Sequence, residues 1–139
     1  MIMKREFKRG PRGPRGPREK SEFDQKVLDI RRVTRVVAGG KRFRFRATVV
    51  LGDRRGRVGV GIDKGADTSE SIEKAARAAK KSLITVPMKN NTIPYTVTGK
   101  FASALVLLKP AAEGRGVVAG GQVRTVMNLA GIPNVTSKI

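Results

Sequence analysis

Apolar and polar positions alternate with a period of two along residues 43–51. The apolar positions are Phe43, Phe45, Ala47, Val49 and Leu51, and the intervening positions include Arg44, Arg46 and Thr48. This pattern predicts a strand with one face in a core and arginines on the other. A second alternation, at Val58, Val60 and Ile62, follows turn residues 52–56, and the β-branched segment 33–37 runs into a turn at residues 38–40. The three segments together predict a three-stranded antiparallel meander.

The pattern changes to a helical period after residue 67. Asp67 followed by Glu70 resembles a capping box at the start of a helix that ends before Pro87. One predicted helical face carries Ile72, Ala75, Ala76, Ala79 and Leu83, and the other carries Lys74, Arg77, Lys80 and Lys81. Glu70–Lys74 and Glu73–Arg77 have the spacing of favourable ion pairs. Three strands with a helix packed on one side make a small α+β domain, predicted over residues 23–86.

A second unit is predicted after a connector at residues 87–95, where two prolines flank two adjacent asparagines. Residues 96–99 suit a short strand, residues 102–109 a buried strand, residues 123–130 a helix and residues 134–139 a further strand. A glycine-rich loop spans residues 113–121. A domain that ends on a strand has little to cover its sheet, so we expect this second α+β domain, residues 96–139, to be incomplete.

Charge adds information about the first residues and about the partner. The chain has 30 Lys and Arg against 11 Asp and Glu, a formal charge of +19, and such a chain repels itself unless a polyanion neutralises it. Residues 8–18 read KRGPRGPRGPR, which holds too few Gly-Pro-Arg triplets for a collagen helix and nothing apolar to bury. We expect residues 1–22 to be a disordered basic arm that phosphate orders, with a solubilising tail as the alternative.

The absence of cysteine and histidine from the sequence excludes several classes of function. Without Cys the chain has no thiol nucleophile, no disulfide and no thiolate ligand for zinc. Without His it has no imidazole ligand for zinc and no imidazole base. The carboxylates show no spacing typical of an acid–base couple. We therefore expect that the protein is not an enzyme and that it binds no cofactor, metal or small-molecule substrate. No apolar run reaches the roughly 18 residues of a membrane span, and the charged start has no signal-peptide core, which favours a cytoplasmic protein.

A glycine pattern near residue 115 resembles a dinucleotide fingerprint, but its surroundings do not fit. Gly114, Gly116 and Ala119 satisfy G-x-G-x-x-A between an apolar strand and a helix. No acidic residue follows Glu113, and no second βαβ half is present to complete a nucleotide site. The glycines instead favour close backbone approach, and the amides that begin the following helix suit a phosphate or a neighbouring protein. Tight packing and turns are likewise indicated by Gly59, Gly61 and Gly65.

The charged positions of the first predicted sheet favour contact with phosphate. Arg44 and Arg46 would also fit a merely solvated strand face, but no nearby acids neutralise them. The adjoining loops carry further cations, namely Lys41, Arg42, Arg54, Arg55 and Arg57. Because arginine matches phosphate bidentately, this surface is interpreted as facing an RNA backbone. Phe43 and Phe45 occupy core-facing positions, which favours backbone and shape recognition over base stacking.

Three segments, in order, resemble the bacterial-type small-subunit ribosomal protein S5 family. They are VVAGGKRFRFRATVVLGDRRGRVGVG (residues 36–61), KAARAAKKSLI (residues 74–84) and KPAAEGRGVVAGGQVRTVMNLAGI (residues 109–132). The resemblance extends from about Phe23 to Ile139. It implies a double-stranded-RNA-binding-like first domain, a second α+β domain and binding to small-subunit ribosomal RNA. The family's second domain continues with a further strand and helix, and the Gly-Pro-Arg arm is not part of the family's common core.

The resemblance also implies neighbours and roles. Ribosomal proteins four and eight of the small subunit are the implied protein partners. The implied roles are holding the head of the subunit against its body, lining the channel through which messenger RNA enters, and contributing to translational accuracy. In the family the first hairpin, here Val33–Arg42 with Gly39, Gly40 and Lys41 at its tip, reaches ribosomal RNA. The loop at residues 113–116 and the following helix face protein four, so the expected protein interface contains Arg115, Gly116 and Arg124.

Together these arguments assign RNA contact to the arm, the first hairpin and the turn after it. The assigned residues are Arg12, Arg15, Arg18, Arg31, Arg32, Arg35, Gly39, Gly40, Lys41, Arg42, Arg44, Arg46, Arg54, Arg55 and Arg57. The main alternative is a free-standing double-stranded-RNA-binding or RNA-chaperone module, which predicts similar affinity for many duplexes. A nucleotide-dependent enzyme would instead bind a dinucleotide saturably.

Overall fold

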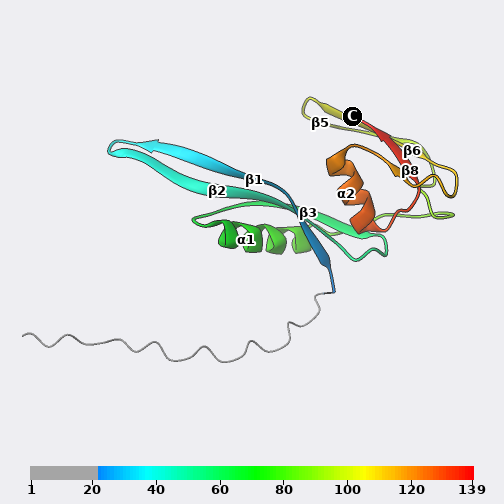
Figure 1. Ribbon diagram of the computed structural model, residues 1–139, viewed down its shortest axis with the longest axis horizontal. Helices are drawn as coiled ribbons and strands as arrows, with labels where there is room; N and C mark the ends of the chain where they lie inside the picture. Colours follow the sequence, from blue (N-terminus) through cyan, green and yellow to red (C-terminus); the bar gives the residue numbers. More distant parts are fainter. Residues whose placement is uncertain (1–21) are drawn as a thin grey trace, which may run out of the picture.

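The computed structural model describes residues 22–139. The predicted basic arm, with Arg12, Arg15 and Arg18, lies outside the described residues except for Glu22. Two four-stranded sheets and two helices make up the described part of the chain (Figure 1). This arrangement confirms the predicted α+β class.

The first sheet contains the predicted meander. Its strands are β1 (Asp24–Val37), β2 (Gly40–Gly52), β3 (Arg57–Gly65) and the short β4 (Ile84–Thr85), in the order β1-β2-β3-β4. All neighbouring pairs are antiparallel. Strand β1 begins at Asp24, well before the predicted residue 33, and its pairing with β2 shifts register between Val27 and Asp29. Such a bulge breaks the simple alternation by which a strand is recognised in a sequence.

Helix α1 (Thr68–Lys81) covers one face of this sheet and begins as predicted. The side chain of Asp67 accepts a hydrogen bond from the Thr68 N–H at 2.7 Å. The two predicted ion pairs on the outer face also form, at 2.7 Å for Lys74–Glu70 and 2.5 Å for Arg77–Glu73. The core beneath the helix combines Ala47, Val49 and Leu51 with Ala75 and Ala79.

Glycines on β3 let this helix approach the sheet closely. A Cβ atom added to Gly61 would lie 2.1 Å from the backbone oxygen of Ala75, and one added to Gly59 would lie 2.4 Å from that of Ala79. Tight packing, predicted for these glycines, is thus confirmed. Of the alternating apolar residues that predicted this strand, Val58 is buried, whereas Val60 and Ile62 are exposed. The side of β3 that α1 covers is therefore its glycine side.

The second sheet has the order β5-β6-β8-β7. Its strands are β5 (Val97–Phe101), β6 (Ala104–Pro110), β7 (Val117–Val118) and β8 (Val135–Lys138), and α2 (Gly121–Ala130) connects β7 to β8. Strand β8 pairs antiparallel with β6 and parallel with β7. The prediction of a buried strand over residues 102–109 is wrong in its start and in its burial, since residues 106–108 are half-buried and the others are exposed. Ala102, with a φ of +51°, belongs to the turn before β6, and Leu105 is 53% exposed.

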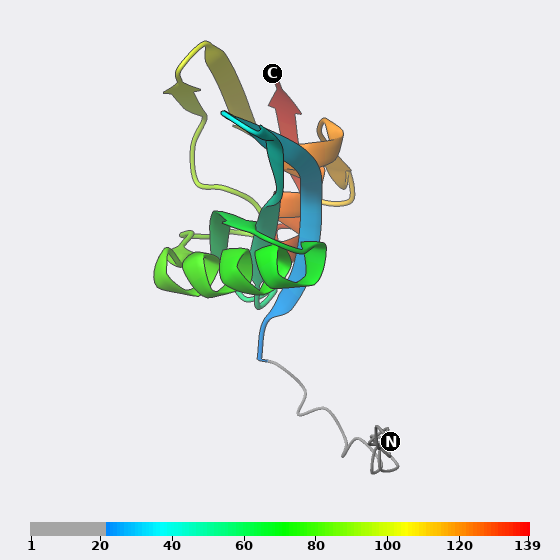
Figure 2. The same cartoon turned by 90° about the vertical axis from the view of Figure 1, so that its left-hand side faces the viewer.

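A shared core joins the two sheets. Val50 and Val58 of the first sheet pack with Leu129 of α2 and with Val135 of β8. Val49 and Val50 are neighbours in β2 and point to opposite faces, so α1 and α2 lie on opposite sides of the first sheet (Figure 2). The segment predicted as a connector contributes to this core, since its Ile93 is only 6% exposed.

The turn between β2 and β3 receives the carboxyl end of α2. The N–H groups of Arg54 and Gly56 donate hydrogen bonds to the carbonyl oxygens of Leu129 and Ala130, at 2.9 and 2.8 Å. These bonds satisfy carbonyl groups that a helix end leaves without partners. A Cβ atom at Gly131 would lie 2.1 Å from the Arg54 carbonyl oxygen, so this contact also needs a glycine.

Candidate nucleic-acid interface

The register of the first sheet gathers cations on one face. Residues directly opposite each other on paired strands project to the same side. Arg46 lies opposite Arg31 on β1 and opposite Lys64 on β3, and Arg35 lies opposite Arg42. The basic face defined by this register consists of Arg31, Arg35, Arg42, Arg44, Arg46 and Lys64. It shares a side with Val50, so it faces the same way as the surface that α2 covers further along the sheet.

The described residues 22–139 do not neutralise the basic face. Between residues 22 and 139, the ion pairs include Arg31, which holds Asp29 at 2.6 Å, but none of the other five members. Directly opposed residues have Cβ atoms about 5 Å apart, and like charges at that separation destabilise a sheet. Arg46 has such a neighbour on each side. A row of phosphates would relieve this repulsion, since each one brings a negative charge to the face.

The basic face is also hollowed. A groove of about 240 Å³ is lined by Val33, Thr34, Arg35, Arg42, Arg44 and Lys64. Its cations come from three strands, while Val33 supplies an apolar part of the lining. A guanidinium group offers up to five donors in a planar fork, so the three arginines suit the non-bridging oxygens of a phosphodiester.

Beyond β3, the first two strands continue as a two-stranded ribbon. Pairing of β2 with β3 stops at Phe45 opposite Gly65, whereas pairing of β1 with β2 continues to Val37 opposite Gly40. The ribbon, residues 33–44, projects from the sheet (Figure 1). At its tip a Cβ atom on Gly39 or Gly40 would meet nothing within 4 Å. The tip of the ribbon therefore leaves room for the close approach of a partner.

The prediction that Phe43 faces a core is wrong. Phe43 has the same parity as the buried Val49 and Leu51, but it lies past the last residue that pairs with β3. It is 49% exposed, and the guanidinium carbon of Arg32 lies 4.7 Å from the centre of its ring. The argument against base stacking assumed a buried ring, so that argument no longer holds.

Arg54, Arg55 and Arg57 lie at the other end of β2 from the ribbon tip. Thirteen residues of strand, at about 3.3 Å each, separate the two ends by about 40 Å. Arg54 pairs with Asp24 at 2.8 Å, and Arg57 pairs with Glu22 at 2.7 Å and with Asp53 at 2.6 Å. The structure thus divides the residues that the sequence grouped. Among the described residues, the ribbon cations have no carboxylate partner, whereas Arg54 and Arg57 of the turn are paired with carboxylates.

The carboxylate of Asp53 organises that turn. It accepts hydrogen bonds from the N–H groups of Arg55 and Arg57, at 2.7 and 3.1 Å, as well as from the Arg57 side chain. Its burial raises the pKa, but the hydrogen bonds to Arg57 and to the two backbone N–H groups outweigh burial and lower the pKa of Asp53 to about 2. Asp53 therefore stays ionised and fixes the shape of the turn whose backbone N–H groups bind the end of α2.

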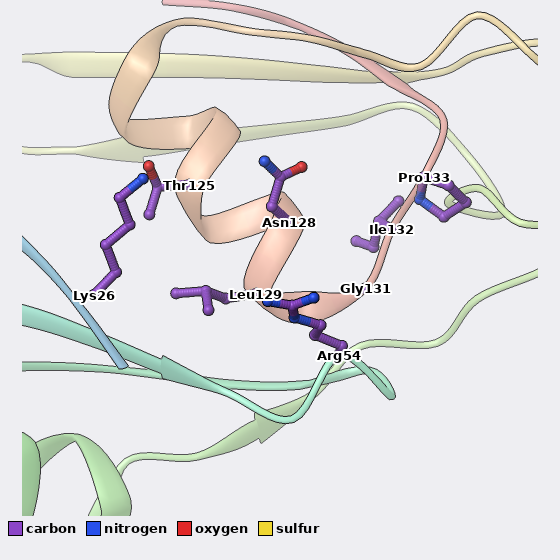
Figure 3. Close-up of a pocket in the computed structure, with 8 residues that line it drawn as sticks. All are labelled: Lys26, Arg54, Thr125, Asn128, Leu129, Gly131, Ile132 and Pro133. Carbon is purple, nitrogen blue, oxygen red and sulfur yellow. The ribbon is translucent and has the colours of Figure 1, made fainter. Parts of the chain in front are cut away.

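A second hollow lies where this turn meets α2 (Figure 3). It has a volume of about 500 Å³ and is lined by Lys26, Arg54, Thr125, Asn128, Leu129, Gly131, Ile132 and Pro133. Lys26 lies opposite Val50, so it projects from the same side of the sheet as the basic face. This hollow is separate from the ribbon and has two cations in its lining, of which Arg54 is paired with Asp24.

The predicted protein interface is on the second sheet's part of the chain. Arg115 is exposed in the loop before β7, and Arg124 is exposed in the first turn of α2. The N–H group of Gly116 donates to the side-chain oxygen of Asn134 at 3.0 Å, and its carbonyl accepts from the Val135 N–H at 3.3 Å. Asn134 is only 5% exposed. A buried amide therefore fixes the loop that presents Arg115.

Sequence reasoning missed Asn134 and Lys64. A single Asn after a proline has no distinctive pattern, because its role depends on a loop eighteen residues away. Lys64 could have been noticed in the sequence, since it continues the alternation of Val58, Val60 and Ile62 and so lies on the same face of β3. Its place in the basic face can be recognised only once Arg46 is known to lie opposite Lys64.

The dinucleotide interpretation finds no support in the local geometry. Gly114 and Gly116 adopt φ values of +83° and +75° in a loop that precedes β7, so a strand separates this loop from α2. The fingerprint requires the loop to lead directly from a strand into a helix. Among residues 22–139, no group of three or more acidic side chains is placed to hold a metal ion. In the same residues, no helix is long and apolar enough to cross a membrane.

Comparison with known families gives two matches, in the order expected from the sequence. Residues 23–87 match the family model described as ribosomal protein S5, N-terminal domain. Residues 99–139 match the one described as ribosomal protein S5, C-terminal domain. Together they cover well over half of the chain, including the whole basic face and both helices. The chain therefore belongs to the ribosomal protein S5 family, a family of structural, RNA-binding proteins of the ribosome.

Proposed function

We propose that this protein is a structural constituent of the small ribosomal subunit and that its basic face docks on the backbone of ribosomal RNA. The observation that carries the proposal is the position of Arg46 between Arg31 and Lys64. Three adjacent strands present like charges to one another, and within the part of the chain that the structure describes only one of those charges has a carboxylate partner. An arrangement that costs stability in the free protein is explained by a partner that supplies negative charge.

The ribbon is the part of the protein that reaches into the RNA. Its two strands are narrow, and the glycines at the tip leave room for close backbone approach. Arginines on the basic face bind phosphate oxygens and release counterions, which supplies affinity that depends on salt. Such contacts recognise the path of the backbone and position the protein without reading sequence.

The finer roles follow from the separation of two surfaces. The ribbon projects from the first sheet, whereas Arg115, Gly116 and Arg124 belong to the second sheet's part of the chain. The protein holds RNA with the first surface and contacts ribosomal protein four with the second, with protein eight as a further neighbour. From this position it helps to hold head against body, lines the channel through which messenger RNA enters, and contributes to accuracy. These tasks need no catalysis and no cofactor.

The test is sedimentation of tagged protein from a cell lysate through a sucrose gradient. We expect stoichiometric migration with small subunits that survives a salt wash. Alanine at Arg44 and Arg46 should weaken RNA binding and flatten its salt dependence, by up to about one unit of slope for each lost phosphate contact. Arg77→Ala is the matched control, since it removes the same charge from the outer face of α1.

The free-standing RNA-binding module predicts different results. The protein would remain in light fractions, and many duplexes would bind with similar affinity. An unchanged salt slope after loss of Arg44 and Arg46 would count against the basic face itself. Arg124→Glu should disturb docking with a protein neighbour while leaving binding to isolated RNA nearly unchanged.

A further inference from the structure

The ribbon has a second face, opposite the basic face, with a different chemistry. We infer that this stacking face, formed by Phe43 with Arg32 and Val36, receives one unpaired nucleobase of the bound RNA. The inference rests on the proposed function, because it names a feature of the RNA that the ribbon binds. It goes beyond backbone contact, which requires no unpaired base.

The geometry of the stacking face comes from the strand register. Thr34 lies opposite Phe43, so Arg32 and Val36 are the diagonal neighbours of the ring on β1. The guanidinium carbon of Arg32 lies 4.7 Å from the ring centre, within the range of a cation–π contact. Val36 is 74% exposed and extends the apolar surface towards the tip. The result is an exposed surface in which a guanidinium group already lies over an aromatic ring.

This surface is not explained as part of a core. Phe43 lies past the end of β3, and the residues that pack under α1 begin further along β2, at Ala47. Leaving half of an aromatic ring in water forgoes the stabilisation that burial would give. The Arg32 contact restrains the ring, so a ligand that stacks there loses little further side-chain entropy.

Charge around the ring identifies the kind of partner. Lys41 precedes Phe43 by two residues on the same face, and the basic face lies on the other side of the same two strands. No Asp or Glu occurs between residues 30 and 52. A planar apolar group that arrives attached to phosphates is a nucleobase, and stacking on aromatic or arginine planes is the usual way in which proteins hold an unpaired one. A protein segment would need acidic side chains to meet the same cations.

The experiment compares two RNA duplexes that differ in one nucleotide. One is fully paired, and the other carries a single bulged 2-aminopurine, whose fluorescence falls when it stacks. Binding of the full chain is measured at several salt concentrations for wild type, Phe43→Leu and Phe43→Tyr. Leucine keeps apolar volume but removes the ring, whereas tyrosine keeps the ring.

We expect wild type to bind the bulged RNA more tightly and to quench its fluorescence. Phe43→Leu should lower affinity for the bulged RNA about five- to tenfold, with an unchanged salt slope and unchanged affinity for the paired duplex. Phe43→Tyr should restore both affinity and quenching. Because Phe43 lies outside the packed cores, thermal unfolding of the variants should resemble that of wild type.

Three results would overturn the inference. Equal affinity for both RNAs in wild type would show that no unpaired base is used. Equal loss on both RNAs in Phe43→Leu would show that the ring acts through the ribbon's shape. If Phe43→Leu no longer sedimented with small subunits while its affinity for both RNAs was unchanged, the ring would be assigned to a protein contact. Failure of the proposed function is distinguishable, because neither RNA would then bind with a salt dependence that Arg44 and Arg46 control.

Discussion

Removing the charge of Arg46 should stabilise the free protein while weakening its binding to RNA. The change is Arg46→Gln, which keeps a long polar side chain. Arg46 faces Arg31 on one side and Lys64 on the other, and each directly opposed like-charged pair costs about 0.2–1 kcal/mol. Since Asp29 partly compensates Arg31, we expect a gain of about 0.5–1 kcal/mol. For a chain of this length that raises the melting temperature by about 2–5 °C.

The assay combines thermal unfolding, followed by circular dichroism, with RNA binding in a salt series. Added salt should stabilise wild type more than the variant, because it screens the repulsion that the variant lacks. RNA affinity should fall and the salt slope should decrease by up to about one unit. Arg77→Gln serves as the control, because Arg77 has a carboxylate partner in Glu73 and its loss should lower stability slightly.

Opposite signs for stability and binding distinguish this reasoning from a purely structural role for Arg46. If Arg46→Gln lowered the melting temperature at every salt concentration, the side chain would be stabilising the sheet through packing. Repulsion between opposed cations would then no longer support the assignment of the basic face.

Three further predictions concern stability. Gly61→Ala should destabilise the protein by about 1–3 kcal/mol in urea denaturation, because the added Cβ would lie 2.1 Å from a backbone oxygen of α1. The control, Gly99→Ala, has open space around the added Cβ and should be nearly neutral. The pKa of Asp53 is lowered from 3.8 to about 2 in the folded state, so its contribution should be complete above about pH 4 and be lost as the pH falls towards 2. Acid titration of Asp53→Asn, which lacks this group, should show less loss over that window, and an identical profile would contradict the assignment. Asn134→Ala should accelerate amide hydrogen exchange at Gly116 and cost about 1–2 kcal/mol, since a half-buried N–H loses its acceptor. Unaltered exchange at Gly116 would mean that other contacts hold the loop.

Local patterns were sufficient to predict three strands of the first sheet and the helix that covers them, but not the early start of β1 or the fourth strand, β4. The alternation along residues 43–51 and the β-branched segment before it predicted paired strands, and Asp67 predicted the start of α1. These signals are local, because side-chain direction in a strand and capping at a helix end depend on neighbouring residues. The ion pair of Glu70 with Lys74 follows from the same geometry.

Burial was predicted less well, because it depends on what covers a face. Phe43 and Ala47 share a parity on β2, yet only Ala47 is buried, since β3 and α1 do not reach Phe43. Val60 lies on the side of β3 away from α1, and α2 covers that side only near Val58. How far a helix or strand covers a neighbouring strand is set by packing between distant segments. The alternation of residues along one strand therefore cannot predict which of its positions are covered.

The amino-acid sequence by itself determined the excess of positive charge, the phase of each strand and the family to which the chain belongs. Only the tertiary structure decided which cations act together. Register brought Lys64 beside Arg46, whereas the length of β2 carried Arg54 and Arg57 to the opposite end of the sheet, where carboxylates pair with them. The physical reason is that periodicity assigns a side chain to one face of its own strand. Its neighbours across strands depend on how bulges, turns and the shared core align those strands.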